Sequence, residues 1–352
     1  MRRFLAGLLA ALMVLSLCAC AAADAPAKTD GQTAAVSWDE LVFDRTMPLL
    51  YDQQFTVEYA GDSYKRITIH DDRVYLLVAE GAAVPAGVPA GVTVLQQPLD
   101  QIYLVAAAAM DYFDKLNAID CITLSGKKQS DWYIQRAKDA MDSGALVYAG
   151  KYSEPDYELI LSQGCDLAVE NTMIYHSPAL YAALLDKEDE AEALFNEKMD
   201  SVADVLEQQP TGKTVAFFYI TSSGAVNVRK STDYVAKCVT IAGGDYVSFD
   251  ESAEDNAQST INIQMESFYH GAVDADVLIY NSIIDGELHT LDELVALDPL
   301  MADFKAVKSG NVWCLTKNFY QESLELSDLI LDVNHALNDA PDTAFHFLTR
   351  MK

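Results

Sequence analysis

The sequence predicts an α/β protein of two lobes, each built on a central, mostly parallel sheet, with one long connector helix between them. First, short apolar strand candidates alternate with amphipathic helix candidates, as in parallel sheets covered by helices. Second, this alternation occurs on both sides of a charged helical stretch at 184–210. Third, 352 residues, of which 51% are hydrophobic, exceed what a single core usually organises.

The first lobe is expected over residues 38–183. Residues 66–69 and 73–78 alternate in polarity around Asp71-Asp72 and predict a hairpin. The α/β alternation follows, with strands expected at 92–96, 119–124, 146–149 and 167–170, and helices at 103–116, 132–141 and 155–162.

The connector helix is expected over 184–210, where Asp, Glu and Ala are dense and Leu194, Met199 and Val202 form an apolar stripe. Pro210-Thr211-Gly212 ends it. The second lobe, 211–352, repeats the alternation, with strands expected at 214–220, 277–280 and 312–315, and helices at 234–242, 263–272, 291–297 and 324–337.

Residues 1–20 have the features of a lipoprotein signal peptide. Arg2 and Arg3 precede an apolar run too short to span a bilayer, and Leu17-Cys18-Ala19-Cys20 resembles a bacterial lipobox. We expect Cys20 to become the lipidated N-terminus of an extracytoplasmic protein that the membrane holds by this anchor alone. Residues 21–37 are then a flexible tether. The alternative is an ordinary secretory signal cut near Ala22.

The composition argues against several classes of function. A net charge of −29 disfavours nucleic acid and anionic membrane surfaces as partners. The six histidines form no HExxH motif, and the cysteines after the lipobox have no metal-type spacing. No GxSxG, P-loop or GxGxxG motif occurs. We therefore expect no enzyme activity, no resident metal and no cofactor.

Segments in both lobes carry a resemblance to a known family. Residues 155–160 (PDYELI) lead into 164–169 (GCDLAV), residues 263–268 (IQMESF) lead into 274–279 (DADVLI), and FKAVKSGNVW occupies 304–313. In this order they resemble the substrate-binding proteins of ABC importers for iron–siderophore, haem and cobalamin. The resemblance implies two Rossmann-like lobes on a rigid helix. It also implies a ferric complex, haem or cobalamin as ligand, and a permease dimer with its ATPase as partner.

Ligand-contacting residues are expected in loops that follow strands, because ligands of open α/β sheets lie beyond the carboxyl ends of the strands. Aromatic side chains there suit a large organic metal complex, and an Arg fork suits its carboxylate or phenolate groups. For each Tyr the alternative is an ordinary half-buried aromatic, and for Arg229 a surface ion pair. The candidates are Trp132, Tyr133, Tyr152, Tyr175, His176, Arg229, Asn281, Lys317 and Tyr320.

Glu158 and Glu266 each fall in the first turn of an expected helix, one in each lobe. Stabilisation of the helix dipole would suffice to explain a Glu there. The resemblance implies a second role, in which the two carboxylates dock onto Arg residues of the permease dimer.

The first lobe departs from the family pattern. After the strand expected at 167–170, the chain runs almost directly into the connector, so about thirty residues, the size of one αβ unit, are absent. A shortened lobe leaves a sheet edge or a smaller pocket. Two alternatives to a transport receptor therefore stay open: a non-transport lipoprotein with a degenerate ligand site, and an extracytoplasmic enzyme, for which the sequence offers no catalytic constellation.

Overall fold

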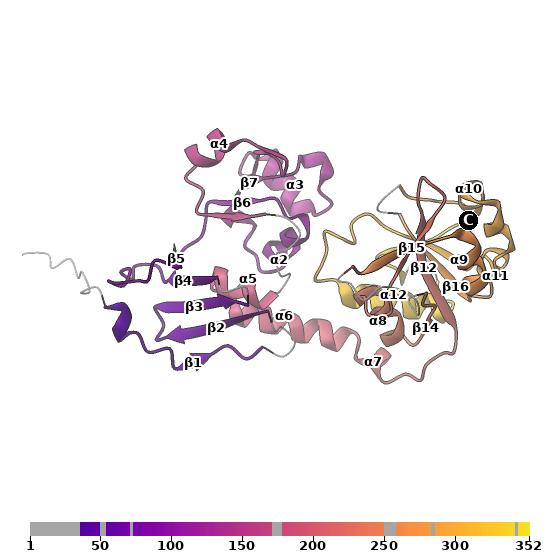
Figure 1. The fold of residues 1–352 in the computed structure, drawn as a ribbon, viewed down its shortest axis with the longest axis horizontal. Coiled ribbons are helices and arrows are strands. Elements are labelled where there is room, and N and C mark those ends of the chain that lie inside the picture. Colours follow the sequence, from indigo (N-terminus) through magenta and orange to yellow (C-terminus); the bar gives the residue numbers. More distant parts are fainter. Residues whose placement is uncertain are drawn as a thin grey trace, which may run out of the picture.

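The computed structural model describes residues 36–49, 54–70, 73–170, 178–249, 258–282, 286–341 and 344–352. Figure 1 shows an N-terminal sheet and an N-lobe sheet at one end of the molecule, a C-lobe at the other, and helix α6 (Glu188–Ser201) running between them. The mixed α/β architecture, with a fully parallel N-lobe sheet and a C-lobe sheet whose central strands are parallel, confirms the predicted fold class. Among the described residues, no helix is long and apolar enough to cross a membrane.

The N-terminal sheet has five strands in chain order, β1 to β5, of which only β4 and β5 pair in parallel. The predicted hairpin is confirmed as its β3–β4 pair. Period-two alternation gives the sheet two apolar faces: one packs on helix α5 and the other on the preceding segment around Trp38 and Phe43. The strands are Arg45–Thr46, Phe55–Ala60, Tyr64–Ile69, Val74–Val78 and Val92–Gln96.

The N-lobe sheet is fully parallel, in the order β11-β6-β7-β8. The prediction of a helix at 103–116 is wrong for its first residues. Ile102–Leu104 is strand β6, and the α-helix begins only at Met110. A short, fully buried apolar run does not reveal its period, so strand and helix look alike there. The other elements are α2 Met110–Lys115, β7 Ile122–Ser125, α3 Gln135–Asp142, β8 Val147–Tyr148, β9 Gly150–Lys151, β10 Glu154–Pro155, α4 Tyr157–Ser162 and β11 Leu167–Val169.

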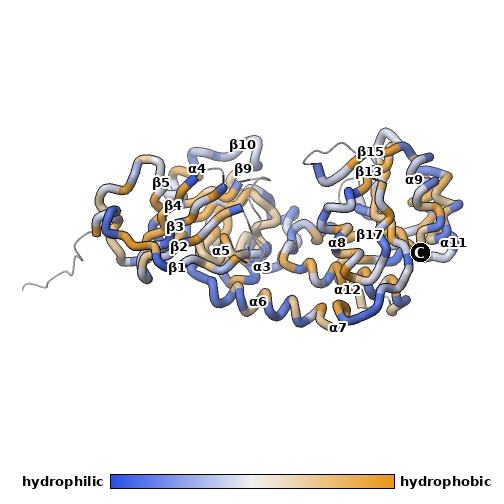
Figure 2. The backbone as a smooth tube through the Cα atoms, turned by 60° about the horizontal axis from the view of Figure 1, so that its bottom comes forward, coloured by the Kyte–Doolittle hydropathy of each residue, from blue (hydrophilic) through white to orange (hydrophobic). Residues whose placement is uncertain are grey.

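The range expected as one connector helix is divided. Helix α5 (Pro178–Leu185) ends where Asp186 takes a left-handed conformation (φ 59°), and α6 (Glu188–Ser201) and α7 (Ala203–Leu206) follow. No residue of α6 is buried, and its tube is largely hydrophilic in Figure 2. Between β11 and α6 the described residues hold only α5 and no further strand of the N-lobe sheet.

The C-lobe sheet has the order β15-β13-β12-β16-β17-β18, with β14 beside the start of β12. Helices α8 and α12 cover one face, and α9, α10 and α11 the other, so the lobe has two apolar cores (Figure 1). The strands are β12 Thr214–Ile220, β13 Val226–Arg229, β14 Asp245–Tyr246, β15 Thr260–Ile263, β16 Val277–Asn281, β17 Val312–Leu315 and β18 Leu348–Arg350. The helices are α8 Tyr234–Ile241, α9 Met265–Ala272, α10 Leu291–Leu297, α11 Lys305–Ser309 and α12 Leu326–Leu337.

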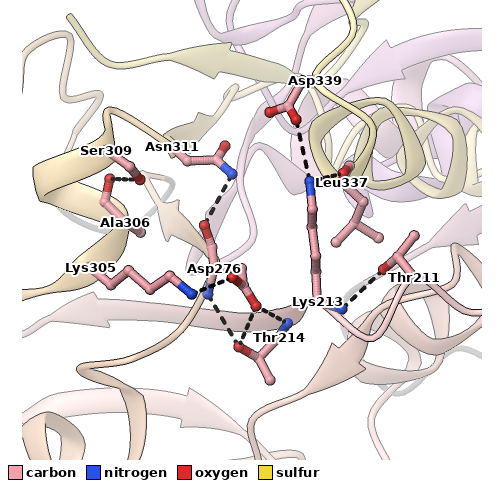
Figure 3. A network of polar contacts seen from close by, with 10 residues as sticks. All are labelled: Thr211, Lys213, Thr214, Asp276, Lys305, Ala306, Ser309, Asn311, Leu337 and Asp339. Carbon is pink, nitrogen blue, oxygen red and sulfur yellow. Dashed lines mark hydrogen bonds and ion pairs between the residues drawn. The ribbon is translucent and has the colours of Figure 1, made fainter.

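A polar network closes the amino edge of the C-lobe sheet (Figure 3). The Asp276 carboxylate accepts hydrogen bonds from the Thr214 N–H (2.8 Å) and hydroxyl (3.2 Å) and from Lys305 Nζ (2.7 Å). Asn311 donates to the Asp276 carbonyl at 3.0 Å. These bonds fix the starts of β12 and β16 to each other. The loops that follow the strands leave the sheet at its opposite, carboxyl edge.

Candidate functional site

The N-lobe contributes the loop that follows β7. The buried Ser125 hydroxyl accepts the Lys127 N–H (3.0 Å) and the Trp132 indole N–H (3.2 Å) and donates to the Lys127 carbonyl (2.8 Å). Gly126 lies so close to β6 that a Cβ there would come within 2.9 Å of the Val105 backbone. The loop is therefore held rigidly, and its Tyr133 side chain, 44% exposed, faces solvent.

The loop that follows β17 in the C-lobe crosses to the N-lobe. Gln321 accepts the Tyr133 N–H at 2.8 Å and donates to the Asp131 carbonyl at 2.9 Å. Ser323 donates to the Ala108 carbonyl at 2.8 Å. We call these contacts, with those of residues 324 and 325 described below, the lobe junction. It joins the lobes at a second place besides the connector.

Arg229 and Tyr320 meet beside this junction. Arg229 ends β13, and its guanidinium donates to the Tyr320 hydroxyl, to Asp233 Oδ2 (3.5 Å) and to Ser259 Oγ (3.4 Å). The Arg229 and Asp233 side chains are 13% and 3% exposed, so this is a largely buried ion pair. Burial raises the pKa of Asp233 against the opposing charge of Arg229. In this structure the Arg229 guanidinium therefore already donates hydrogen bonds to three protein side chains.

Asn281 and Lys317 lie at the carboxyl ends of neighbouring strands. Asn281 is the last residue of β16, is buried, and pairs in register with Leu315 of β17. Lys317 follows β17, is half-buried, and its backbone N–H donates to Glu287 Oε1 at 3.3 Å. Lys317 thus lies in the expected loop at the carboxyl edge, whereas Asn281 is still part of the strand and is buried there.

Trp132 has a different environment from its neighbour Tyr133. Its ring is fully buried in the N-lobe core, and its indole N–H bonds Ser125. The side chain therefore packs the lobe and offers no face to a ligand in this structure. Nothing in an irregular loop signals which of two adjacent aromatics points inward, because the loop has no periodicity.

Tyr152 lies between β9 and β10 and is 69% exposed. Two further tyrosines at this edge of the N-lobe are exposed, Tyr148 at the end of β8 and Tyr157 at the start of α4. The sequence could have indicated them, since each adjoins the carboxyl end of an expected strand or the start of the next helix. Tyr103 below them donates to the Gly150 carbonyl, and burial raises the pKa of Tyr103 to about 12.

The remaining predicted residues divide into two groups. Glu158 and Glu266 are exposed in the first turns of α4 and α9, where the sequence places them. Tyr175, His176 and Cys20 lie outside the described residues.

The described residues hold no cluster of three or more His, Cys, Asp or Glu that could bind a metal ion. The exposed or half-buried candidates in the strand-following loops, Tyr133, Tyr152, Lys317 and Tyr320, are aromatic or cationic, so they suit stacking on and hydrogen bonding to a preformed organic complex. A polar cavity of about 390 Å³ lies elsewhere, between the N-terminal sheet and the α5–α6 turn, where Lys65 and Glu188 line it.

Comparison with known proteins gives one curated relative and several similar folds. No family model matches the chain. An uncharacterized lipoprotein of Methanocaldococcus jannaschii is 22% identical over 338 residues, which cover 83% of this chain and 80% of that protein.

The similar folds are bacterial binding proteins. A protein of the ABC-type Fe³⁺-hydroxamate transport system of Saccharomonospora viridis has a TM-score of 0.51 at 17% identity, over 69% of this chain and 94% of its own. The triscatecholate siderophore binding protein FeuA of Bacillus subtilis, complexed with ferri-bacillibactin, has a TM-score of 0.52 at 15% identity, over 70% and 95%. A periplasmic haem binding protein of Pseudomonas aeruginosa has a TM-score of 0.51 at 14% identity, over 72% and 98%.

These matches include nearly the whole of each binding protein, so both lobes and the connection between them are shared. The chain therefore has the two-lobed fold of these binding proteins, which is the fold that its sequence motifs predicted.

Proposed function

We propose that this protein is an extracytoplasmic solute-binding lipoprotein that captures an iron complex, either a siderophore or haem, or a corrinoid, and delivers it to an ABC importer. The observation that carries the proposal is the fold shared with binding proteins over nearly their full length. The lipobox at Cys20 and the lipoprotein relative support a lipid anchor and an extracytoplasmic location.

The residue types in the strand-following loops support the ligand class. The exposed Tyr133 and Tyr152 of the N-lobe offer flat apolar faces with polar tips, and the C-lobe loop after β17 carries Lys317 and Tyr320. Such groups bind the organic shell of a complex rather than a bare metal ion. Capture and release of a preformed complex need no catalytic residues.

The proposed partner is a permease dimer with its ATPase. Glu158 and Glu266 are exposed on different lobes, at the starts of α4 and α9. Two carboxylates on separate lobes can orient the whole protein on a two-fold partner, and surface pairs of this kind mainly set orientation and association rate.

Binding is tested on the soluble chain from Ala21 onward, which omits the lipidated Cys20, first by native mass spectrometry and then by tryptophan fluorescence titration with ferric siderophores, haem and cobalamin. We expect one of these to bind with a Kd of about 1 μM or tighter. Tyr133→Ala should weaken binding roughly tenfold, the scale of one lost aromatic contact. Leu161→Ala, which removes a large apolar side chain that is 79% exposed on α4, should leave the Kd unchanged.

The same titration separates the alternatives. A folded chain that binds none of the three ligand classes would contradict the transport proposal and favour a non-transport lipoprotein with a degenerate site. Conversion of a ligand into a product of different mass would instead indicate an enzyme.

A further inference from the structure

A buried carboxylate at the lobe junction has one oxygen that no described residue bonds. Asp111, on α2, is 0% exposed. Its Oδ2 accepts the backbone N–H of Leu324 at 2.6 Å, whereas its Oδ1 has no hydrogen-bond partner among the described residues. A buried anionic oxygen without a partner is costly, so the protonation state of this group matters for the contact between the lobes.

The charged groups that face Asp111 come from both lobes. Lys115 lies one turn along the same helix, and Glu322 and Glu325 lie on the C-lobe loop. Glu325, only 3% exposed, pairs with Lys115 and also with Lys198 of α6. One carboxylate thus joins the N-lobe, the connector and the C-lobe.

This pairing decides which carboxylate keeps its charge. Burial alone would raise the pKa of Glu325, but the ammonium groups of Lys115 and Lys198 outweigh it and hold that pKa below its usual range. Because Lys115 is committed to Glu325, it only partly offsets the burial of Asp111. Burial, with the neighbouring charges of Glu325 and Glu322, raises the pKa of Asp111 to about 7 despite the Leu324 N–H.

We propose that Asp111 is a proton-operated latch between the lobes, closed when its side chain is a neutral acid packed against residues 323–325 and loosened when it ionises. With the lobes apart, Asp111 is solvated and has an ordinary pKa near 4. Because the pKa of Asp111 is higher when the lobes are packed together, its protonated side chain stabilises the lobe junction fully below about pH 4. This stabilisation is lost as the pH rises through about 7. The junction is therefore tighter at pH 5.5 than at pH 8.

The latch is tested on the mature chain by following the Leu324 amide by NMR in leucine-labelled protein, with the signal assigned from Leu324→Ile. We expect its shift to titrate with a midpoint near pH 7. Asp111→Asn, a neutral isostere, should abolish this titration. Asp114→Asn should leave it intact, since Asp114 lies on the same helix and pairs with Arg136 instead.

Hydrogen exchange provides a second readout. After correction for intrinsic rates, the amides of 323–325 should be less protected at pH 8 than at pH 5.5, and Asp111→Asn should remove this difference. Either a Leu324 amide that does not titrate between pH 5 and 8, or a protection difference that persists in Asp111→Asn, would overturn the proposal.

A further variant keeps the test decisive if Asp111→Asn does not fold. Glu322→Gln removes one of the negative charges that raise the pKa of Asp111 and leaves Asp111 itself in place. The Leu324 midpoint should then move to lower pH, and an unchanged midpoint would contradict the latch. None of these readouts involves a ligand, so they stand whether or not the transport proposal holds.

Discussion

At the scale of single residues, two carboxylates of this protein depend on pH in opposite directions. Asp111 keeps its contact when protonated, as described above. At Asp276, burial would raise the pKa, but Lys305 and the two Thr214 groups outweigh burial and lower it. Asp276 therefore contributes stability above its ordinary pKa near 4, and this contribution is lost as pH falls through the lowered value.

Asp276→Asn should lower the free energy of unfolding at pH 7 by about 1 kcal/mol, because a neutral amide accepts weaker bonds from Lys305 and Thr214. The difference from wild type should shrink as the pH falls below about 4 toward the lowered pKa of Asp276, and urea unfolding at several pH values measures it. Asp274→Asn, an exposed neighbour, is the matched control with little expected effect. A loss that is equal at pH 3 and pH 7 would refute the role of the Asp276 charge.

Residue types at the candidate site could be read from the sequence, but their orientations could not. Tyr133, Lys317 and Tyr320 lie in strand-following loops as expected. Trp132 is buried instead, and Arg229 is engaged by Tyr320 and Asp233. Such partners come from other parts of the chain, 91 residues away for Arg229 and Tyr320, and local sequence does not encode them.

At the scale of elements, the C-lobe was the easier part to predict. Its strands at 214–220 and 312–315 are apolar runs bounded by turn residues, and the structure has them at these positions. The break at Asp186 was not predictable, because no Gly or Pro marks it. Tertiary contacts hold it: Lys65 of β3 donates to the Ala183 carbonyl and pairs with Asp186 and Glu188, each at 2.6 Å.

Lys65→Met should therefore lower the free energy of unfolding by roughly 1–3 kcal/mol, since the Lys65 side chain is only 9% exposed and its partners lose their buried cation. Lys187→Met is the control: it removes an exposed pair with Glu190 and should cost about 0.5 kcal/mol or less. Chemical denaturation compares the two variants. If they were equally stable, the Lys65 cluster would have no part in fixing the α5–α6 turn.

At the scale of the whole molecule, the two-lobed fold was predictable because three motifs in the right order span both lobes. Of the N-terminal sheet, the sequence indicated the β3–β4 hairpin and the strand at 92–96, which was expected to begin the α/β alternation of the first lobe. The structure instead places 92–96 as β5, beside β4. All five strands precede residue 155, where the first segment that carries the family resemblance begins, so no motif indicated a five-stranded unit. The three binding proteins match only 69–72% of this chain, which leaves room for such an addition.

The double variant Glu158→Ala/Glu266→Ala tests delivery to the permease. Uptake by cells of whichever ligand the titration identifies should be abolished, while the Kd of the purified protein stays unchanged, because both side chains are exposed at helix starts. Glu197→Ala, an exposed carboxylate on α6, is the control and should support normal uptake. A weakened Kd in the double variant would show that these residues serve the binding site and not docking.

Helix α5 belongs to two cores at once. Leu180 and Ala183 pack into the N-terminal sheet, while Tyr181 stacks on Tyr112 in the N-lobe at 4.8 Å between ring centroids. Neither core can lose this helix without opening the other. We therefore expect the N-terminal sheet and the N-lobe to unfold as a single cooperative unit, so that any boundary between separately unfolding parts of the chain lies at the connector and not between these two sheets.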